Sequence, residues 1–595
     1  MVTLQFFTMR ARYLPFLALF VLSVPLPGQG LQVLSVFPRN QEIQAAPTTP
    51  IVVEFDAAVD PASVQGFAVK VFGRWSGPMP GELKLSAGNT RLEFTPDEPF
   101  FAGEWVSVTL SKAVKSSAGQ ALEKGYFWNF WIATQPGTLN QSFKEEIPLR
   151  QAGEGLLQTY GAYAGDLNDD GYSDLTVVNE TADDLRILLN DGQGNYPTMT
   201  VLPMGGNGTP SPNEGADFNN DGAIDLAVTT AWNDEVRILF GDGNGSFSDP
   251  LVLETQNGVR GIVVADFNLD GWDDFFTTNR LSGNMTIFLN DGSGGFTQTL
   301  YNTAALGETA CALTDANNDG IADIFVGAFE SREILLLLGD GNANFTLSTS
   351  VDVAGQPWML ATGDLNGDGN ADVVSANSSG DVTSVLLGTG TGGMTLWSQL
   401  QFDDATFPLA IDLGDLDGDG DLDMVTSNYS SKNYSVLEND GQGNFSLAVL
   451  LQTPFLGPDN LASCAILHDR NNDGDLDISL TDEGEDLLIL FTNGDDTVST
   501  SSQTLPGGTL TLSPNPSSHP TAIRFSLPLA LPAGLRILDL QGREIFALPA
   551  RPYSPGWHSL TWNGRTQTGT PTPPGVYWVL IETPKGVLRG KLVLP

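Results

Sequence analysis

The residues best suited to chemistry in this chain form a short acidic pattern, Asp-x-Asn/Asp-x-Asp-Gly-x-x-Asp, which occurs seven times at intervals of 49 to 54 residues. Oxygen ligands at positions 1, 3, 5 and 9 can converge on a hard cation, and the glycine at position 6 permits the sharp turn between them. Calcium takes six to eight such oxygens, so the pattern predicts calcium as the cofactor. The predicted ligands are Asp166, Asn168, Asp170, Asp174, Asp217, Asn219, Asp221, Asp225, Asp266, Asn268, Asp270, Asp274, Asp315, Asn317, Asp319, Asp323, Asp364, Asn366, Asp368, Asp372, Asp415, Asp417, Asp419, Asp423, Asp469, Asn471, Asp473 and Asp477.

The elements that position these loops are predicted to be strands. The pattern begins like an EF-hand loop, but its last acid stands at position 9 instead of 12, and no helical pattern flanks it. Short apolar runs rich in β-branched residues, such as residues 225–230 and 261–265, flank the loops instead and indicate strands. An acidic Asx turn without a metal is the alternative for a single copy. Seven copies that keep every ligand position favour calcium.

Each repeat continues with a second strand, a third strand, an Asp-Gly hairpin such as Asn190-Asp-Gly192, and a fourth strand. A period of about 50 residues indicates a repeat architecture. Four antiparallel strands per repeat, seven times over, predict an all-β fold with a seven-bladed β-propeller at residues 136–497. These units resemble the FG-GAP/VCBS repeats of integrin α-subunit propellers and of many bacterial surface proteins. The fifth unit departs from that pattern, because Gly388-Thr-Gly-Thr-Gly-Gly393-Met394 lacks the usual Asp and aromatic residue.

The seventh unit is one strand short. Strands are expected near residues 476–481 and 487–491, and the chain then becomes polar. Residues 142–149, ahead of the first loop, resemble an orphan fourth strand. We therefore expect them to complete the seventh blade, which would close the ring with chain from both ends and hide an exposed edge.

A second domain precedes the repeats. Residues 31–135 contain strand-like segments at 51–55, 67–72, 92–94, 105–110 and 127–131, separated by turn residues, and predict an Ig-like β-sandwich. The opening Val36-Phe-Pro38, then Val53-Glu-Phe55 and the closing Trp128-Asn-Phe130 resemble bacterial Ig-like domains of the surface-layer type. This resemblance implies a spacer module.

The two ends of the chain indicate export. Arg10 and Arg12 precede an apolar run from 13 to 24, which is too short to span a membrane and predicts a signal peptide at residues 1–30. Residues 498–512 form a Ser/Thr/Gly linker. The tail at 513–595 is sandwich-like, and its motifs Ser513-Pro-Asn-Pro516, Leu535 to Gly542, Gly556 to Gly564, Pro574 to Tyr577 and Lys591 to Leu594 follow one another in order.

The tail resembles the C-terminal sorting domain of the type IX secretion system. That resemblance implies the type IX secretion machinery as a partner, and a protein secreted from, or attached to the outer surface of, a Gram-negative cell. An ordinary Ig-like module is the alternative.

Charge excludes several partners. The net charge is −44, and residues 136–512 hold 9 Lys/Arg against 58 Asp/Glu. An electronegative surface of this kind argues against nucleic acid and anionic membranes. No transmembrane segment is predicted. Cys311 and Cys464 occupy equivalent positions of two different repeats and are predicted to be unpaired, buried thiols.

Catalytic chemistry has little support. Three histidines and two cysteines without zinc-type spacing give no transition-metal site. Gly388, Gly390 and Gly393 match Gly-x-Gly-x-x-Gly, but they lie in a predicted hairpin between strands, so the match is accidental. We therefore predict no catalytic residues and a protein that is not an enzyme.

Three functions remain open: a calcium-binding protein that recognises a glycan or protein ligand, a lyase-like polysaccharide enzyme, and a structural surface protein without a ligand. For recognition, the predicted face is the one opposite the acidic loops, where aromatic and arginine side chains without a metal role can anchor a ligand. Integrin-like propellers also bind ligands on this face, by analogy. The predicted ligand-binding residues are Trp232, Arg260, Arg280 and Trp358. Packing of the two tryptophans between blades is the alternative.

Overall fold

A computed structural model describes residues 30–205, 208–452, 459–494, 509–513, 520–538, 544–567, 569–583 and 586–594. Residues 1–29 of the predicted signal peptide, most of the predicted linker, Pro514 to Pro516 and residues 539–543 of the predicted sorting motifs lie outside the described residues. The described parts form strands and three short 3-10 turns, with no α-helix. The all-β prediction is confirmed. Two compact units divide the chain, Met1–Gly494 and Asp495–Pro595.

The first unit begins with two four-stranded sheets, here called the N-terminal sandwich (residues 31–135). One sheet has the order β1 (Val33–Phe37), β2 (Ile51–Phe55), β6 (Arg91–Pro96), β5 (Gly81–Ser86), and the other β4 (Gly77–Pro78), β3 (Val69–Gly73), β7 (Trp105–Leu110), β8 (Tyr126–Trp131). The turns η1 (Pro61–Ser63) and η2 (Gly66–Ala68) precede β3. The strand predicted from residue 67 therefore starts only at Val69, because Gly66 adopts a left-handed φ of 63° and opens a turn. Alternating side chains of both sheets, such as Trp128 and Phe130, form one core.

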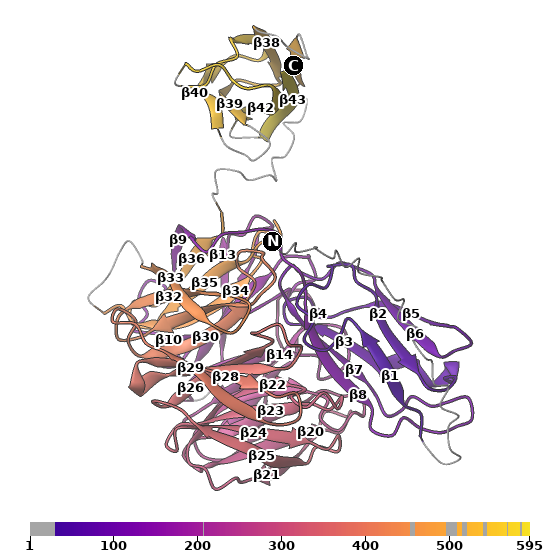
Figure 1. The fold of residues 1–595 in the computed structure, drawn as a ribbon. Coiled ribbons are helices and arrows are strands. Elements are labelled where there is room, and N and C mark those ends of the chain that lie inside the picture. The colour runs from indigo at the N-terminus through magenta and orange to yellow at the C-terminus, as the bar shows by residue number, and fades with distance from the viewer. Residues whose placement is uncertain are drawn as a thin grey trace, which may run out of the picture. The chain divides into compact units, whose positions relative to one another are not determined.

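Residues 136–494, here called the repeat region, form seven four-stranded antiparallel sheets (Figure 1). The first three are β10 (Thr159–Gly165), β11 (Asp174–Asn179), β12 (Asp184–Leu189), β13 (Thr198–Pro203); β14 (Pro210–Ala216), β15 (Asp225–Thr230), β16 (Glu235–Leu239), β17 (Leu251–Glu254); and β18 (Val259–Ala265), β19 (Asp274–Asn279), β20 (Asn284–Asn290), β21 (Phe296–Tyr301). The next two are β22 (Glu308–Thr314), β23 (Asp323–Ala328), β24 (Glu333–Gly339), β25 (Phe345–Asp352); and β26 (Pro357–Gly363), β27 (Asp372–Asn377), β28 (Val382–Gly388), β29 (Met394–Leu400), with η3 (Ser378–Gly380) after β27. The last two are β30 (Pro408–Gly414), β31 (Asp423–Asn428), β32 (Asn433–Asn439), β33 (Phe445–Leu451); and β34 (Ala462–His468), β35 (Asp477–Asp482), β36 (Leu487–Thr492), β9 (Ser142–Pro148).

The seventh sheet draws its outer strand from the other end of the repeat region. Strand β9 pairs antiparallel with β36, and Leu488 lies opposite Ile147. The prediction that residues 142–149 supply the missing strand is therefore confirmed. The pairing covers the edge of β36 that would otherwise present unpaired N–H and C=O groups.

The first strands of successive sheets contact one another in order, and β34 also contacts β10. The second strand of every sheet, from β11 to β35, is buried at all six positions. Apolar clusters join neighbouring sheets, as where Phe276 of β19 shares a core with Ile324 of β23. Burial on both faces explains why these second strands lack the alternation of apolar and exposed polar residues of a half-buried strand, and their Thr, Ser and Asn side chains are buried as well.

The N-terminal sandwich packs on the ends of the sheets that hold the acidic loops. The N–H of Phe127 donates to the carbonyl of Gly320 at 2.7 Å, and the N–H of Asp166 donates to the carbonyl of Trp75 at 2.7 Å. Gln44 Nε2 donates to Asp415 Oδ2 at 3.2 Å. A spacer was expected here, but the sandwich and the repeat region form one compact unit.

The second unit also contains two sheets. They have the orders β37 (Thr509–Ser513), β38 (Thr521–Leu527), β41 (Gly556–Trp562), and β40 (Glu544–Tyr553), β39 (Leu531–Leu538), β42 (Gly575–Thr583), β43 (Gly586–Leu594). Phe525, Ile537, Trp562 and Val579 are buried in the core between them. Within the described residues, no helix is long and apolar enough to cross a membrane.

Candidate functional site

Six of the seven acidic loops share the geometry that the loop at Asp266 illustrates, whereas in the loop at Asp415 the N–H of Gly418 donates to Asp415 Oδ1 instead. Asp266 Oδ1 accepts from the N–H of Asp270 at 2.9 Å, and Asp266 Oδ2 accepts from the N–H of Gly271 at 2.7 Å. Asn268 Oδ1 accepts from the N–H of Asp270 at 2.9 Å. The backbone turns through left-handed φ values of 58° at Leu269 and 102° at Gly271. Side chains at positions 1, 3 and 5 are thus gathered around one tight turn, as the pattern predicts.

The aspartate at position 9 lies deeper and joins the loop to the hairpin of its own sheet. Asp274 is fully buried. Its Oδ1 accepts from the N–H of Asn290 at 2.8 Å, and its Oδ2 accepts from the N–H of Phe267 at 3.1 Å. In all seven sheets one carboxylate oxygen accepts the equivalent hairpin N–H, and the acceptors are Asp174, Asp225, Asp274, Asp323, Asp372, Asp423 and Asp477. The aspartate at position 9 therefore connects the loop to the hairpin of the same sheet, and we call this pair of contacts the carboxylate latch.

A neighbouring asparagine links adjacent sheets. Asn290 Nδ2 donates to the carbonyl of Phe218 in the preceding loop at 2.8 Å and to the carbonyl of Asp273 at 3.2 Å. The same pair of bonds is made by Asn190, Asn439 and Asn493. The Asn-Asp-Gly hairpins thus stabilise the contact between sheets, a role that the hairpin pattern alone did not reveal.

Burial disfavours the ionised form of the aspartates in these loops. It raises the pKa of Asp166 to about 6, that of Asp174 to about 7 and that of Asp323 to about 8, and nearby aspartates raise each of them further. A bound cation would favour the ionised carboxylates.

The donor set fits a hard divalent cation. At Asp415, Asp417 and Asp419, one carboxylate oxygen from each residue lies within 4.8 Å of the others. Oxygen-only ligands of this kind suit calcium. The residues at positions 1, 3 and 5 would hold the ion. The position 9 aspartates, which were also predicted as ligands, accept backbone N–H groups, as Asp274 does, and their role as ligands stays a prediction. A bound calcium would neutralise the crowded carboxylates.

Three of the four predicted ligand-binding residues meet on the opposite face. Trp358 Nε1 donates to Tyr160 Oη at 2.5 Å. The guanidinium of Arg260 lies 5.7 Å from the ring centre of Tyr160 and 5.6 Å from that of Trp358. The guanidinium of Arg280 lies 3.8 Å from the ring centre of Phe329 and 5.3 Å from that of Trp358. We call Tyr160, Arg260, Arg280, Phe329 and Trp358 the mouth cluster, while Trp232 is 77% exposed outside it.

Ion pairs hold the arginines of the mouth cluster. Arg260 Nη1 lies 3.2 Å from Glu180 Oε1, and Arg280 Nη2 lies 3.1 Å from Glu330 Oε1. Gln158 Nε2 donates to Glu180 at 3.1 Å and to Glu483 at 3.0 Å. Burial raises the pKa of Glu483 to about 7.

Sequence reasoning missed several residues of this face, although a signal for them exists. The residue 14 positions after the first loop aspartate directly follows the second strand of each sheet. Its identity changes from repeat to repeat, through Glu180, Ala231, Arg280, Phe329, Ser378, Tyr429 and Glu483. Variation at one equivalent position within a repeated framework would have pointed to this ring.

Comparison with known families agrees with the repeat pattern. The FG-GAP-like repeat family matches residues 166–228, 217–277, 266–326, 315–375 and 364–426, and the bacterial Ig-like domain family matches residues 28–131. The chain therefore contains five FG-GAP-like repeats and an N-terminal bacterial Ig-like domain. Both are extracellular-type modules and indicate a recognition or structural protein. A search of curated proteins finds no significant match.

Several solved structures resemble parts of the chain at low scores. They include a functionally unknown protein from Desulfotomaculum acetoxidans (12% identity, 51% of this chain and 91% of that chain, TM-score 0.37). They also include a putative 6-phosphogluconolactonase from Bacteroides uniformis (15% identity, 56% of this chain and 94% of that chain, TM-score 0.36). A third is an auxiliary nutrient binding protein from Bacteroides thetaiotaomicron (11% identity, 79% of this chain and 99% of that chain, TM-score 0.32). These scores support no functional inference.

Proposed function

We propose that the repeat region is a seven-bladed β-propeller of a secreted or surface-attached protein, and that it binds a glycan or protein ligand through the mouth cluster. Support for the propeller comes from the order of contacts, in which each first strand meets the next and β34 meets β10. Strand β9 then completes the seventh sheet with chain from the other end of the region.

The observation that carries the binding proposal is the mouth cluster itself. It combines two arginines and three aromatic rings from sheets one, three, four and five at one place. Arginine and aromatic side chains are the usual anchors of sugars and proteins. The N-terminal sandwich occupies the loop end, so this face is the one left for a ligand.

Calcium has a structural role in this proposal. Each loop brings three or four carboxylates together, and their repulsion opposes the turn until a cation neutralises it. Extracellular calcium modules bind at about 10⁻⁴–10⁻³ M, so millimolar calcium is expected to stabilise the repeat region. The C-terminal unit is proposed to be a type IX sorting domain, which its two-sheet fold and ordered motifs support.

A screen of the calcium-loaded full chain against a glycan array, cells and matrix proteins tests the binding function. Once a ligand is found, Arg280→Ala is expected to weaken binding at least about tenfold while the melting temperature stays within a few degrees. Trp232→Ala tests the exposed tryptophan in the same way. Trp397→Ala is the matched control, because Trp397 is also exposed (51%) but lies on the outer strand β29. Absence of binding to every glycan, cell and matrix would favour a structural protein.

One observation favours a second candidate, polysaccharide cleavage. Burial raises the pKa of Glu180, which Arg260 at 3.2 Å opposes, and burial and the nearby Glu180 raise the pKa of Glu483 to about 7. Two carboxylates in different electrostatic surroundings can serve as base and acid. An assay for new reducing ends and unsaturated products on polysaccharides tests this candidate, and Glu483→Gln would have to abolish any activity found.

A further inference from the structure

A cavity of about 280 Å³ lies along the middle of the repeat region. The first strands of all seven sheets line it. Lys70, Arg74 and Trp105 of the N-terminal sandwich border it at the loop end, and Tyr160, Arg260 and Trp358 border it at the opposite end. Its volume is near the lower limit of small-molecule pockets, roughly 300 Å³.

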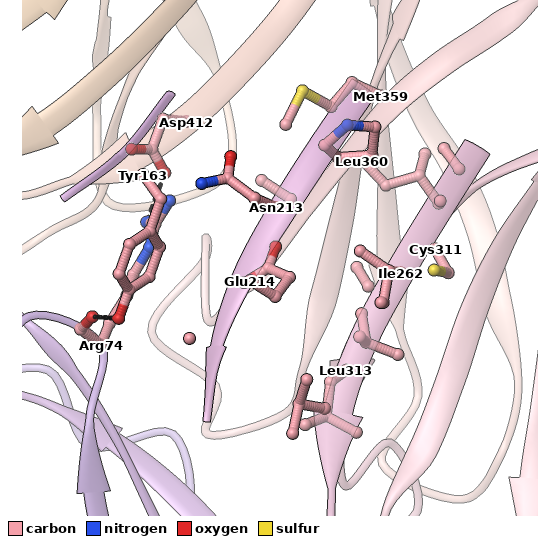
Figure 2. Close-up of a pocket in the computed structure, with 18 of the residues that line it drawn as sticks. Arg74, Tyr163, Asn213, Glu214, Ile262, Cys311, Leu313, Met359, Leu360 and Asp412 are labelled. Atoms are coloured by element: carbon pink, nitrogen blue, oxygen red, sulfur yellow. Dashed lines mark hydrogen bonds and ion pairs between the residues drawn. The ribbon is translucent and has the colours of Figure 1, made fainter. Parts of the chain in front are cut away.

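The cavity has a polar side and an apolar side (Figure 2). Arg74, Tyr163 and Asp412 lie on one side, Ile262, Leu313, Met359, Leu360 and Cys311 lie on the other, and Glu214 stands on the strand between them. A wall divided in this way suits a ligand with one charged group and a hydrocarbon body.

The charges on the polar side are paired, with one exception. Arg74 Nη1 lies 2.7 Å from Asp412 Oδ1, and Asp412 Oδ2 accepts from the N–H of Leu467 at 2.9 Å. Tyr163 Oη donates to the carbonyl of Arg74 at 2.8 Å. Lys70 Nζ lies 2.8 Å from Asp273 Oδ1.

The exception is Glu214. No hydrogen bond or ion pair to this side chain occurs within the described part of the chain. Glu214 is half-buried in the cavity wall, where desolvation of a carboxylate is costly. Burial raises its pKa to about 7, although the charge of Arg74 lowers it. A cationic group beside it would remove that cost.

We propose that this cavity binds a small organic cation, whose ammonium group pairs with Glu214 and whose hydrocarbon body lies against Ile262, Leu313, Met359 and Leu360. Arg74 is hydrogen-bonded to Asp412, while its charge also acts on Glu214. A neutral alcohol of the same length lacks the charge, and a carboxylate is repelled by Glu214. Glu214 is not part of the mouth cluster, which borders the opposite end of the same cavity through Tyr160, Arg260 and Trp358.

Calorimetric titration of the full, calcium-loaded chain with butylammonium, hexylammonium and benzylammonium at pH 8.5 tests the site, with hexanol and hexanoate as probes of the same size. At this pH Glu214 is ionised and the amines are protonated. We expect saturable 1:1 binding of at least one ammonium ion, and binding weaker by at least about tenfold for hexanol and hexanoate.

Glu214→Gln keeps the shape of the side chain and is expected to weaken ammonium binding at least about tenfold. Glu254→Gln, which changes an exposed carboxylate of β17 outside the cavity lining, is the matched control and should bind like the wild type. Equal melting temperatures for both variants show that they fold. The proposal is overturned if none of the three ammonium ions binds, if hexanol binds as tightly, or if Glu214→Gln has no effect.

Discussion

Asp274→Asn tests whether the ninth aspartate of each loop acts as a latch. Asp274 uses both carboxylate oxygens, one for the N–H of Asn290 at 2.8 Å and one for the N–H of Phe267 at 3.1 Å. Asparagine offers a single side-chain oxygen. Its amide NH₂ would therefore face one of these two N–H groups and leave that buried donor without an acceptor.

The expected cost follows from that loss. A hydrogen bond to a charged group contributes about 1.5–3 kcal/mol, and a buried donor without a partner costs about 1–3 kcal/mol. Burial and Asp266 raise the pKa of Asp274 well above its usual range. We therefore expect the free energy of unfolding to fall by about 2 kcal/mol, with or without calcium.

Asp270→Asn is the matched control in the same loop. Asp270 is exposed, and its Oδ1 accepts from the N–H of Trp272 at 3.0 Å, a bond that an asparagine oxygen can also accept. In excess EDTA this variant should stay within about 0.5 kcal/mol of the wild type. In calcium it should lose stability, because one charged ligand of the proposed site is gone.

Urea unfolding of the full chain, followed by tryptophan fluorescence, compares each of the two variants with the wild type in EDTA and in millimolar calcium. The latch is refuted if Asp274→Asn and Asp270→Asn have the same stability in EDTA. The loop is not a calcium site if calcium leaves the wild type unchanged or if Asp270→Asn responds to calcium as the wild type does.

Three further predictions concern other parts of the chain. The native pKa of Glu214 (about 7) exceeds its usual 4.5, so its contribution to stability should fall by roughly 1–3 kcal/mol as pH rises from about 4.5 to about 7. The unfolding free energies of the wild type and of Glu214→Gln are compared across that pH range. Their difference separates the contribution of Glu214 from those of Arg74, Tyr163 and Asp412, and a difference that stays constant with pH would contradict the prediction. Deletion of β9 should expose the edge of β36 and produce oligomers in size-exclusion chromatography with light scattering; a stable monomer would refute this role. Removal of residues 513–595 should retain the protein in the periplasm by cell fractionation, and normal secretion would refute the sorting role.

The strands were predictable because their signals are local. An apolar run, an acidic loop and an Asp-Gly hairpin recur within each 50-residue unit, and each signal depends on residues a few positions apart. The strand at 142–149 is non-local, but counting strands was enough to find it, since the seventh unit lacked one. The start of β3 was placed wrongly, because the turn at Gly66 overrides the apolar pattern around Phe67.

The contacts of the N-terminal sandwich were not predictable in this way. Arg74 and Asp412 are 338 residues apart in the chain and meet only because the sandwich packs on the loop end. Neither residue belongs to a motif that names its partner. The cavity with Glu214 was missed for the same reason, because its walls come from seven separate strands and a different domain.

The two ends of the repeat region differ in how freely their residues can change. At the loop end, Asp174 and its six counterparts hold the hairpins, and the sandwich packs above them, so a substitution there disturbs several sheets together. At the opposite end, the N–H of the residue after each second strand donates to a backbone carbonyl in all seven repeats, but its side chain is left out of that pattern and ranges from Ala231 to Arg280 and Phe329. The repeats therefore keep the residues that hold the fold, and they differ in the side chains of this one ring. This contrast is the physical reason to look for a ligand at the mouth cluster instead of at the acidic loops.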